Sequence, residues 1–255
     1  MKFLIQKINK EIRHDFSFTL LESIRYNNWL HNGVEMKCKF IDYINPYDFK
    51  VWEFKDYHSN YVPVGTVEFV LFYMKWFSIP QPLPMNVPDE LIPYAGRYIY
   101  NCNHMDLEDL NMDRYFIKSA DKIKGTAGII NKGEIPISQG NYQISDVIDI
   151  VSEWRCFVYK GELVGIQNYS GDFTLFPSVS RIKEMIQTFK SAPIAYTLDV
   201  GVNKIGRSDV LIQTFVIECH DFFSCGLYGF SDHRIYPHML QRWFNEYKQK
   251  TYNKL

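Results

Sequence analysis

The sequence predicts a protein of mixed α and β structure in two parts, an α/β domain over residues 1–112 and an α+β domain over residues 113–255. Three observations support this fold class. Runs rich in Val, Ile, Phe and Tyr, bounded by turn residues, are typical of strands. Two segments show the three-and-four spacing of apolar residues that amphipathic helices have. The first part alternates strand and helix, whereas the last third consists mainly of successive strands.

The composition is that of an ordinary globular protein. Of the 255 residues, 46% are hydrophobic and 22% are charged, so the chain can bury a large core and disorder is not expected. The formal net charge of −1 argues against nucleic acid as the main partner, because binding of that kind needs a basic surface.

Cysteine usage and the N-terminal segment predict a cytoplasmic protein. The five cysteines form no Cys-x-x-Cys pair, which favours reduced thiols over disulfides or a zinc site. Near the N-terminus, an apolar stretch of only four residues is followed by charges, a pattern that predicts neither a secretory signal nor a membrane span.

The first part opens with a strand at Lys2–Gln6 and a helix at Asp15–Leu30, whose apolar residues recur at helical spacing. Further strands are expected at Val34–Tyr43 and Phe49–Phe54, separated by a turn at Asn45-Pro46.

The segment Val62–Phe77 contains a break followed by a long apolar run. We expect a helix that opens at Thr66, with Glu68 near its positive N-terminal end. Gly65 either has a structural role or allows close approach to a ligand. Five prolines between Pro80 and Pro93 then predict a connector without regular structure, which extends to about Met112.

The second part begins with a strand at Tyr115–Ser119 that carries Lys118 and runs into a loop with Lys122, Lys124, Gly125 and Gly128. A lysine at the end of a strand beside such a loop is suited to binding polyphosphate, and a solvated lysine on an edge strand is the alternative. The sequence contains neither a P-loop motif nor a Rossmann glycine motif.

Strands and one strong helix follow. The stretch Tyr142–Phe173 predicts strands with a hairpin at Lys160-Gly161, and Ser180–Ala192 predicts a helix capped by its first serine. After it we expect the strands Ala195–Val202 and Val210–Glu218, joined by a hairpin turn at Gly201–Asp209. The tail, Tyr236–Lys254, is expected to be helical.

Chemically active residues lie on three of these strands. Arg155 lies in the run SEWRCFV, Asp199 in AYTLDVGV, and Glu218, His220 and Asp221 in the run that starts at Thr214. Two acids, an imidazole and a guanidinium that converge from neighbouring strands can bind a divalent metal and a phosphate chain.

The order of the motifs FIK, EWR, LDVG, IE-x-x-D and GLYGF resembles the ATP-grasp superfamily, and most closely its phage and bacterial R2K-type clade. The resemblance covers roughly residues 114–247. It implies an ATP-grasp fold, in which two α+β subdomains hold ATP, preceded here by a small α/β domain that helps to bind the substrate.

The resemblance also implies roles for individual residues. Lys118 matches the strand lysine that contacts the α- and β-phosphates, and Lys124 in the following loop is a second candidate ligand of ATP. Arg155 matches the arginine that stabilises the transferring γ-phosphate, while Asp199 and Glu218 match the acids that hold Mg²⁺. The hinge whose backbone pairs with adenine corresponds to Val147, Ile148, Asp149 and Ile150, and Asp149 is also placed to reach the ribose.

The sequence departs from the family pattern at one place, where Glu218-Cys219-His220 replaces the usual Glu-x-Asn. His220 can coordinate a metal through a ring nitrogen, but imidazole suits Mn²⁺ or Zn²⁺ better than Mg²⁺, which prefers oxygen ligands. Alternatively, Asp221 supplies the third ligand, although the next residue on a regular strand points to the opposite face. A third interpretation makes His220 a hydrogen-bonding residue beside the site.

The implied activity is that of an ATP-dependent carboxylate–amine ligase that works through an acyl phosphate, with a peptide or protein as one candidate substrate. A phosphotransferase and a nucleotide-binding module with decayed catalysis are the alternatives, since one fold hosts different reactions. Without the resemblance, Asp199, Glu218, His220 and His233 would suggest a metal hydrolase. Arg97, like Lys124, is a candidate ligand of a substrate carboxylate or a plain surface charge.

Overall fold

The computed structural model describes residues 1–30, 35–43, 59–110, 112–134, 138–206 and 212–252. The chain divides into two compact units. Unit 1 comprises residues 1–82, 193–195 and 221–255, and unit 2 comprises residues 83–192 and 196–220. The domain boundary expected at residue 112 stays a prediction.

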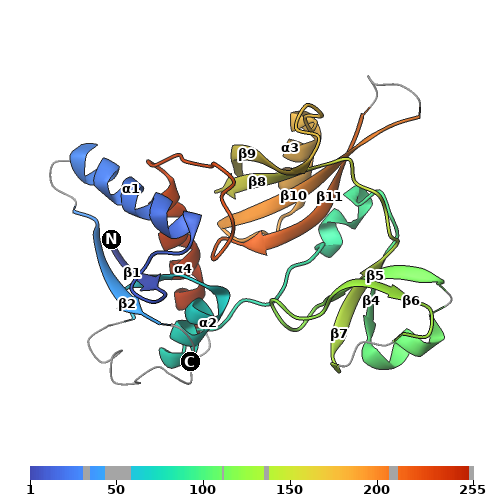
Figure 1. Cartoon of the computed structure of the whole chain (residues 1–255), viewed down its shortest axis with the longest axis horizontal. Coiled ribbons are helices and arrows are strands. Elements are labelled where there is room, and N and C mark those ends of the chain that lie inside the picture. The colour runs from blue at the N-terminus through green and yellow to red at the C-terminus, as the bar shows by residue number, and fades with distance from the viewer. Residues whose placement is uncertain (31–34, 44–58, 111, 135–137, 207–211, 253–255) are drawn as a thin grey trace. The chain divides into compact units, whose positions relative to one another are not determined.

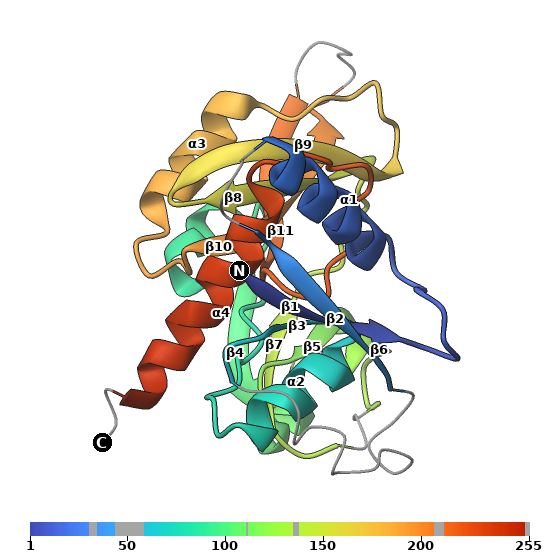
Figure 2. The ribbon, with the colours of Figure 1, turned by 90° about the vertical axis from the view of Figure 1, so that its left-hand side faces the viewer.

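Unit 1 contains a three-stranded parallel sheet with the strand order β2-β1-β3 (Figures 1 and 2). Its strands are β1 (Lys2–Lys7), β2 (Lys37–Asp42) and β3 (Val62–Val64). Its helices are α1 (Asp15–Leu30), α2 (Val67–Trp76) and α4 (Tyr236–Tyr252), of which α1 packs against α4 and α2 packs beside β3. The βα opening and the helical tail predicted from the sequence are therefore confirmed.

The junction between β3 and α2 shows why the helix begins where it was predicted. The Thr66 side chain caps α2 by accepting a hydrogen bond from the Phe69 backbone N–H at 3.2 Å. The buried Gln6 side chain accepts from the Thr66 N–H at 2.6 Å. Gly65 lies between these groups, because a Cβ there would stand 2.5 Å from the Gln6 Cβ and 2.7 Å from the Phe69 ring. Gly65 therefore has a structural role.

The first sheet of unit 2 has the order β4-β7-β5-β6, and all of its pairings are antiparallel. Its strands are β4 (Ile99–Asn103), β5 (Arg114–Ser119), β6 (Ala127–Asn131) and β7 (Asn141–Ser145). Two 3₁₀-helices, η2 (Asp89–Tyr94) and η3 (His104–Asp109), flank β4 in the sequence.

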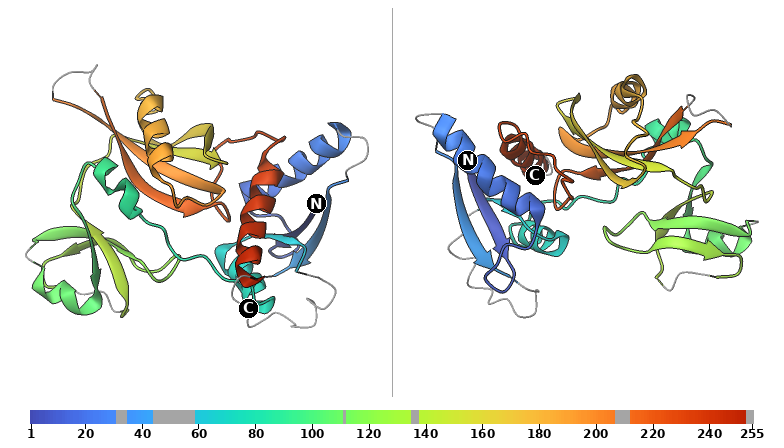
Figure 3. Two further views of the ribbon diagram at one scale, coloured as in Figure 1. Left: turned by 180° about the vertical axis from the view of Figure 1, so that it is seen from behind. Right: turned by 45° about the horizontal axis from the view of Figure 1, so that its top comes forward.

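The second sheet of unit 2 has the order β11-β10-β8-β9, and α3 (Val179–Thr188) lies on one face of it (Figure 3). Its strands are β8 (Ser152–Tyr159), β9 (Glu162–Gly171), β10 (Ala195–Lys204) and β11 (Ile212–Asp221). The β8–β9 hairpin turns at Lys160 and Gly161 as predicted, and both residues have the positive φ that two-residue hairpin turns favour.

One face of this second sheet builds the main hydrophobic core of the unit. Leu198, Val200 and Val202 of β10 pack there against Ile182 and Met185 of α3. The alternate residues of β10, including Asp199 and Gly201, therefore face the other side. We call this other side the site face.

We expected a connector without regular structure from the proline-rich segment to about Met112. This prediction is wrong over much of the segment, because η2, β4 and η3 lie within it. Pro93 is tolerated in η2 because the short i→i+3 bonds are donated by Leu91 and Ala95, so its missing N–H is not needed. β4 exists because it pairs with the distant strand β7.

Two smaller expectations also change. Helix α3 is capped by Ser178 and not by Ser180, since the Ser178 hydroxyl accepts from the Arg181 N–H at 3.3 Å. The strand Phe49–Phe54, the turn Asn45-Pro46 and part of the hairpin turn before β11 fall outside the described residues.

Within the part of the chain that the structure describes, no helix is long and apolar enough to cross a membrane.

We expect Gly65→Ala to destabilise the protein by about 1–3 kcal/mol, because the added methyl group overpacks a tight junction. Gly128→Ala is the matched control, since a Cβ at Gly128 in β6 meets nothing within 4 Å. Urea unfolding of both variants measures the difference. Equal stability of the two variants would contradict the structural role of Gly65.

Candidate active site

The charged residues selected from the sequence come from two sheets of unit 2. Arg155 lies on β8, Asp199 on the adjacent β10, and Glu218 and His220 on β11, so three neighbouring strands of one sheet contribute. Lys118 lies near the end of β5 in the other sheet.

Arg155 and Asp199 form a buried ion pair. The Arg155 Nε and Nη2 donate to the two oxygens of Asp199 at 2.8 and 2.7 Å, which is the bidentate geometry of the strongest guanidinium–carboxylate pairs. The two residues are only 8% and 1% exposed, so little water competes with these bonds. The Tyr169 ring lies 5.7 Å from the guanidinium, and its hydroxyl donates to Glu153 at 2.8 Å.

Lys118 and Glu218 form a second ion pair, and it joins the two sheets. Burial lowers the pKa of Lys118 to about 8, with the Asp199 charge opposing this change and the Arg155 charge adding to it. The other oxygen of Glu218 lies 2.6 Å from the His220 Nε2.

Asp199, Glu218 and His220 each offer a ligand atom, and these three atoms lie within 4.8 Å of one another. Two carboxylate oxygens and one imidazole nitrogen form a donor set that suits Mg²⁺ or Mn²⁺, with the nitrogen favouring Mn²⁺. The residues present therefore fit a divalent cation. Their assignment as metal ligands is a proposal.

Asp221 does not join this group. Its carboxylate is 5% exposed and accepts hydrogen bonds from the Trp243 Nε1 at 2.8 Å and from the Tyr247 hydroxyl at 3.0 Å. Burial raises the pKa of Asp221 to about 6, partly offset by these two bonds. Of the two alternatives for the third ligand, the geometry favours His220 over Asp221.

The predicted hinge, residues 147–150, is a segment without helix or strand between β7 and β8. Asn203 of β10 fixes its backbone, because the Asn203 side chain donates to the Asp149 carbonyl at 2.8 Å and accepts from the Val151 N–H at 2.9 Å. The Ile150 side chain also lies close to Gly201 on the site face. The pairing of this hinge with adenine stays a prediction.

The loop between β5 and β6 carries Lys124, which is exposed and has a φ of +56°. Its turn is held by Ser119, whose hydroxyl accepts from the Lys122 N–H at 3.1 Å, and by the Gly125 N–H, which donates to the Lys122 carbonyl at 3.0 Å. There is no room for a side chain at position 125, since a Cβ on Gly125 would stand 2.7 Å from the Ser119 Cβ. The role of Lys124 stays a prediction.

Arg97 and His233 are placed differently from the cluster. The Arg97 guanidinium donates to the main-chain oxygens of Val216 at 2.9 Å and Ile217 at 3.1 Å. Its role as a substrate ligand stays a prediction. His233 belongs to unit 1, where its Nδ1 lies 3.0 Å from the Ser23 hydroxyl.

Three residues around the site were not selected from the sequence. Asn203 lies on the same face of β10 as Asp199 and Gly201, because alternate residues of a strand face the same side. The sequence therefore contained a pattern that could have identified Asn203. Tyr169 carried no local signal. Asn86 carried none either, because its role depends on distant contacts: its carbonyl accepts from the Cys219 N–H at 2.6 Å, and its side chain donates to the Ser119 carbonyl at 3.0 Å. Asn86 therefore ties the strand of Glu218 to the strand of Lys118.

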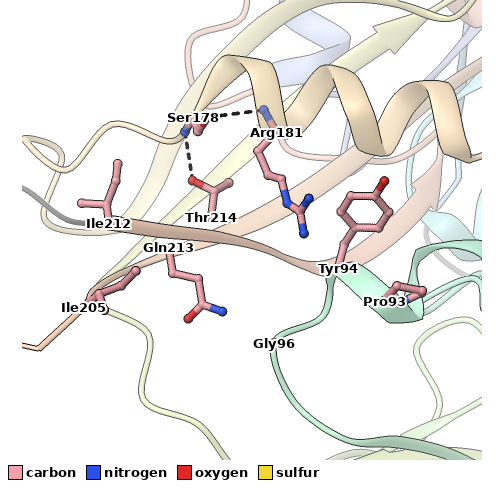
Figure 4. A pocket seen from close by; sticks show the side chains of 9 residues that line it. All are labelled: Pro93, Tyr94, Gly96, Ser178, Arg181, Ile205, Ile212, Gln213 and Thr214. Atoms are coloured by element: carbon pink, nitrogen blue, oxygen red, sulfur yellow. Dashed lines mark hydrogen bonds between the residues drawn. The ribbon is translucent and has the colours of Figure 1, made fainter.

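A separate cavity of about 320 Å³ opens near the start of α3 (Figure 4). The Arg181 guanidinium stands 4.3 Å from the centre of the Tyr94 ring there. None of the residues discussed above as ATP or metal ligands lines this cavity, whose lining consists of Pro93, Tyr94, Gly96, Ser178, Arg181, Ile205, Ile212, Gln213 and Thr214.

Comparison with known proteins relates this chain to a family and to solved structures. The model of the ATP-grasp domain, R2K clade family 2, matches residues 94–237. The structure of D-alanine--D-alanine ligase from Bacillus anthracis complexed with ATP aligns over 98% of this chain and 99% of its own, with 11% identity and a TM-score of 0.52. N5-carboxyaminoimidazole synthetase from Staphylococcus aureus aligns over 95% of this chain and 78% of its own, with 10% identity and a TM-score of 0.54. No curated protein matches. These likenesses confirm the predicted ATP-grasp fold.

We expect Asp199→Ala to lower the free energy of unfolding by about 3–5 kcal/mol, because it leaves the buried Arg155 charge without its partner. The double variant Arg155→Met/Asp199→Ala should recover part of this loss, since no unpaired charge remains. Urea unfolding at neutral pH measures both, with Glu218→Gln as a less buried control. If the double variant is no more stable than Asp199→Ala, the unpaired charge is not the cause.

Proposed function

The chain belongs to family 2 of the R2K clade of ATP-grasp domains. On this premise, we propose that it is an ATP-dependent ligase that joins a carboxylate to an amine. The reaction proceeds through an acyl phosphate and releases ADP and phosphate. A peptide or protein is a candidate for one of the two substrates.

The observation that carries this proposal is the pairing of two cations with two carboxylates at one place. Arg155 is bonded to Asp199, and Lys118 is paired with Glu218. The two carboxylates also belong to the three-residue group that suits a divalent cation. Cations for a phosphate chain and ligands for its metal thus lie together, as phosphoryl transfer requires.

Each residue has a defined task in ATP binding. The backbone of residues 147–150 pairs with adenine, and the side chain of Asp149 reaches the ribose. Lys118 and Lys124 bind the phosphates, and Arg155 stabilises the negative charge that develops on the transferring γ-phosphoryl group. Asn203 fixes the hinge backbone through its bonds to Asp149 and Val151.

Asp199, Glu218 and His220 hold the divalent cation, which when bound neutralises charge on the phosphates. An oxygen of the substrate carboxylate attacks the γ-phosphorus, and the bond to the ADP oxygen breaks. The amine nitrogen then attacks the acyl carbon, phosphate leaves, and the amine gives up a proton. The protein positions and neutralises the reactants and needs no nucleophile of its own.

Incubation of the protein with ATP, Mg²⁺ and mixtures of amino acids and peptides tests this reaction. The proposal expects ADP together with an amide product detected by mass spectrometry. A phosphorylated product without an amide would instead indicate a phosphotransferase. Tight ATP binding by calorimetry, with no ADP under any mixture, would indicate a binding module without catalysis.

We expect Lys118→Ala to lower the rate of ADP formation by about 10²–10³, because a half-buried cation that faces the phosphates in the proposed site is lost. Lys183→Ala, on the exposed side of α3, is the matched control and should keep the wild-type rate. Steady-state kinetics with saturating acceptor give the comparison. A rate within a few-fold of wild type for Lys118→Ala would remove Lys118 from the proposed site.

We expect His220→Asn to shift the metal preference from Mn²⁺ towards Mg²⁺, with a change on the order of tenfold in the ratio of the two rates, because an amide oxygen replaces an imidazole nitrogen. Parallel titrations of ADP formation with MnCl₂ and MgCl₂ measure this ratio. Asp221→Asn should leave the ratio unchanged. An unchanged ratio in His220→Asn would place His220 beside the metal and not on it.

A further inference from the structure

Strand β11 does not alternate regularly between the two faces of its sheet. Phe215 faces the site side, because a Cβ on Gly201 would stand 2.5 Å from its ring. Glu218 faces the same side, since it belongs to the group with Asp199. The two residues are three positions apart, whereas residues on one face of a regular strand are separated by an even number of positions.

The opposite face of β11 shows the same irregularity. Val216 and Cys219 both lie in the hydrophobic core that α3 covers, and they too are three positions apart. The stretch between Val216 and Cys219 therefore contains one residue more than regular alternation allows, which is the arrangement of a β-bulge. Without it, Glu218 would point into this core.

Arg97 binds the chain at this point. Its guanidinium donates from Nη1 to the Val216 carbonyl at 2.9 Å and from Nη2 to the Ile217 carbonyl at 3.1 Å. Successive carbonyls of a regular strand point in opposite directions, so a single planar group that reaches both fits only an irregular strand. Arg97 Nη1 also donates to the Ala95 carbonyl at 3.2 Å, and its Nε donates to the Ser145 hydroxyl at 3.3 Å.

We propose that Arg97 is a positioning residue that holds this irregularity in β11 and thereby places Glu218 and His220 on the site face. This role does not require Arg97 to bind a substrate, because the guanidinium is directed at main-chain oxygens. The consequence for metal binding rests on the proposed function, whereas the consequence for the strand does not.

Two buried thiols of the same core allow a direct test. Cys219 follows Glu218 on β11, Cys156 lies on β8, and both are 0% exposed. In Arg97→Met, Cys219 should react with a thiol reagent on the order of tenfold faster or more under native conditions, because hydrogen bonds from a charged donor are lost. Cys156 should stay protected. Mass spectrometry of the labelled peptides reports each thiol separately.

Arg97→Lys is the conservative variant and should give an intermediate labelling rate, because one ammonium group retains the charge but cannot reproduce the planar fork that reaches both carbonyls. Equal acceleration of both thiols in Arg97→Met, or protection of both, would overturn the proposal. Neither labelling rate depends on ATP or on activity. The labelling experiment therefore decides the role of Arg97 even if the protein is not a ligase.

Mn²⁺ binding followed by electron paramagnetic resonance tests the link to the metal. Arg97→Met should lose Mn²⁺ binding, and deletion of Ile217 in that variant should restore it, because removing the extra residue leaves Glu218 on the site face without help from Arg97. Suppose that the wild type binds Mn²⁺ and that the deletion variant keeps Cys156 protected but does not bind the ion. This result would overturn the link between Arg97 and metal binding. The labelling results stand whether or not the deletion variant folds.

Discussion

The buried pair of Arg155 and Asp199 is the interaction on which the site depends. Both residues lie on adjacent strands of one sheet and are almost fully removed from water, so neither charge is tolerable there alone. The fork of Arg155 occupies both oxygens of Asp199 and thereby fixes the orientation of the carboxylate. Because the pair lies on the face opposite the hydrophobic core, the core is built without interruption by charge.

The division of β11 between two environments follows from strand geometry. His220 lies with Glu218 and Asp199, whereas Asp221 turns away to accept bonds from Trp243 and Tyr247. Adjacent residues of a strand face opposite sides, so one short stretch supplies both the site and a buried polar contact elsewhere. Asp221 is only 5% exposed, and this burial raises the pKa of its carboxyl group.

Local sequence patterns predicted those features that interactions between neighbouring residues determine, such as helix bounds and helix caps. The helix Asp15–Leu30 has its observed bounds, and the cap at Thr66 begins α2 as expected. The order of the motifs identified the ATP-grasp fold, and alternation along β11 predicted opposite faces for His220 and Asp221.

Distant contacts explain what the sequence did not reveal. β4 was taken for a connector because its partner, β7, lies about forty residues later in the chain. The bulge in β11 depends on Arg97, which lies 120 residues before Ile217, so no local pattern indicates it. Asn86 ties β5 to β11 in the same non-local manner. Interactions of this kind are specified by the folded topology and not by spacing along the chain.

The charge balance of the site explains how its charges are tolerated in the folded chain, and in the proposed function the same balance suits the site to bind ATP. Two cations and two carboxylates neutralise one another, which satisfies the buried charges of Arg155 and Asp199 and the half-buried charges of Lys118 and Glu218. Mg-ATP presents the same two signs of charge in one ligand, a cation and a chain of phosphates. In the proposed function, each carboxylate would exchange a protein cation for the metal, and each protein cation would exchange a carboxylate for a phosphate. In the proposed reaction, the binding of Mg-ATP therefore replaces two internal ion pairs by new ones and leaves no charge unpaired. The fixed positions of Arg155 and Lys118 would then serve both folding and phosphoryl transfer.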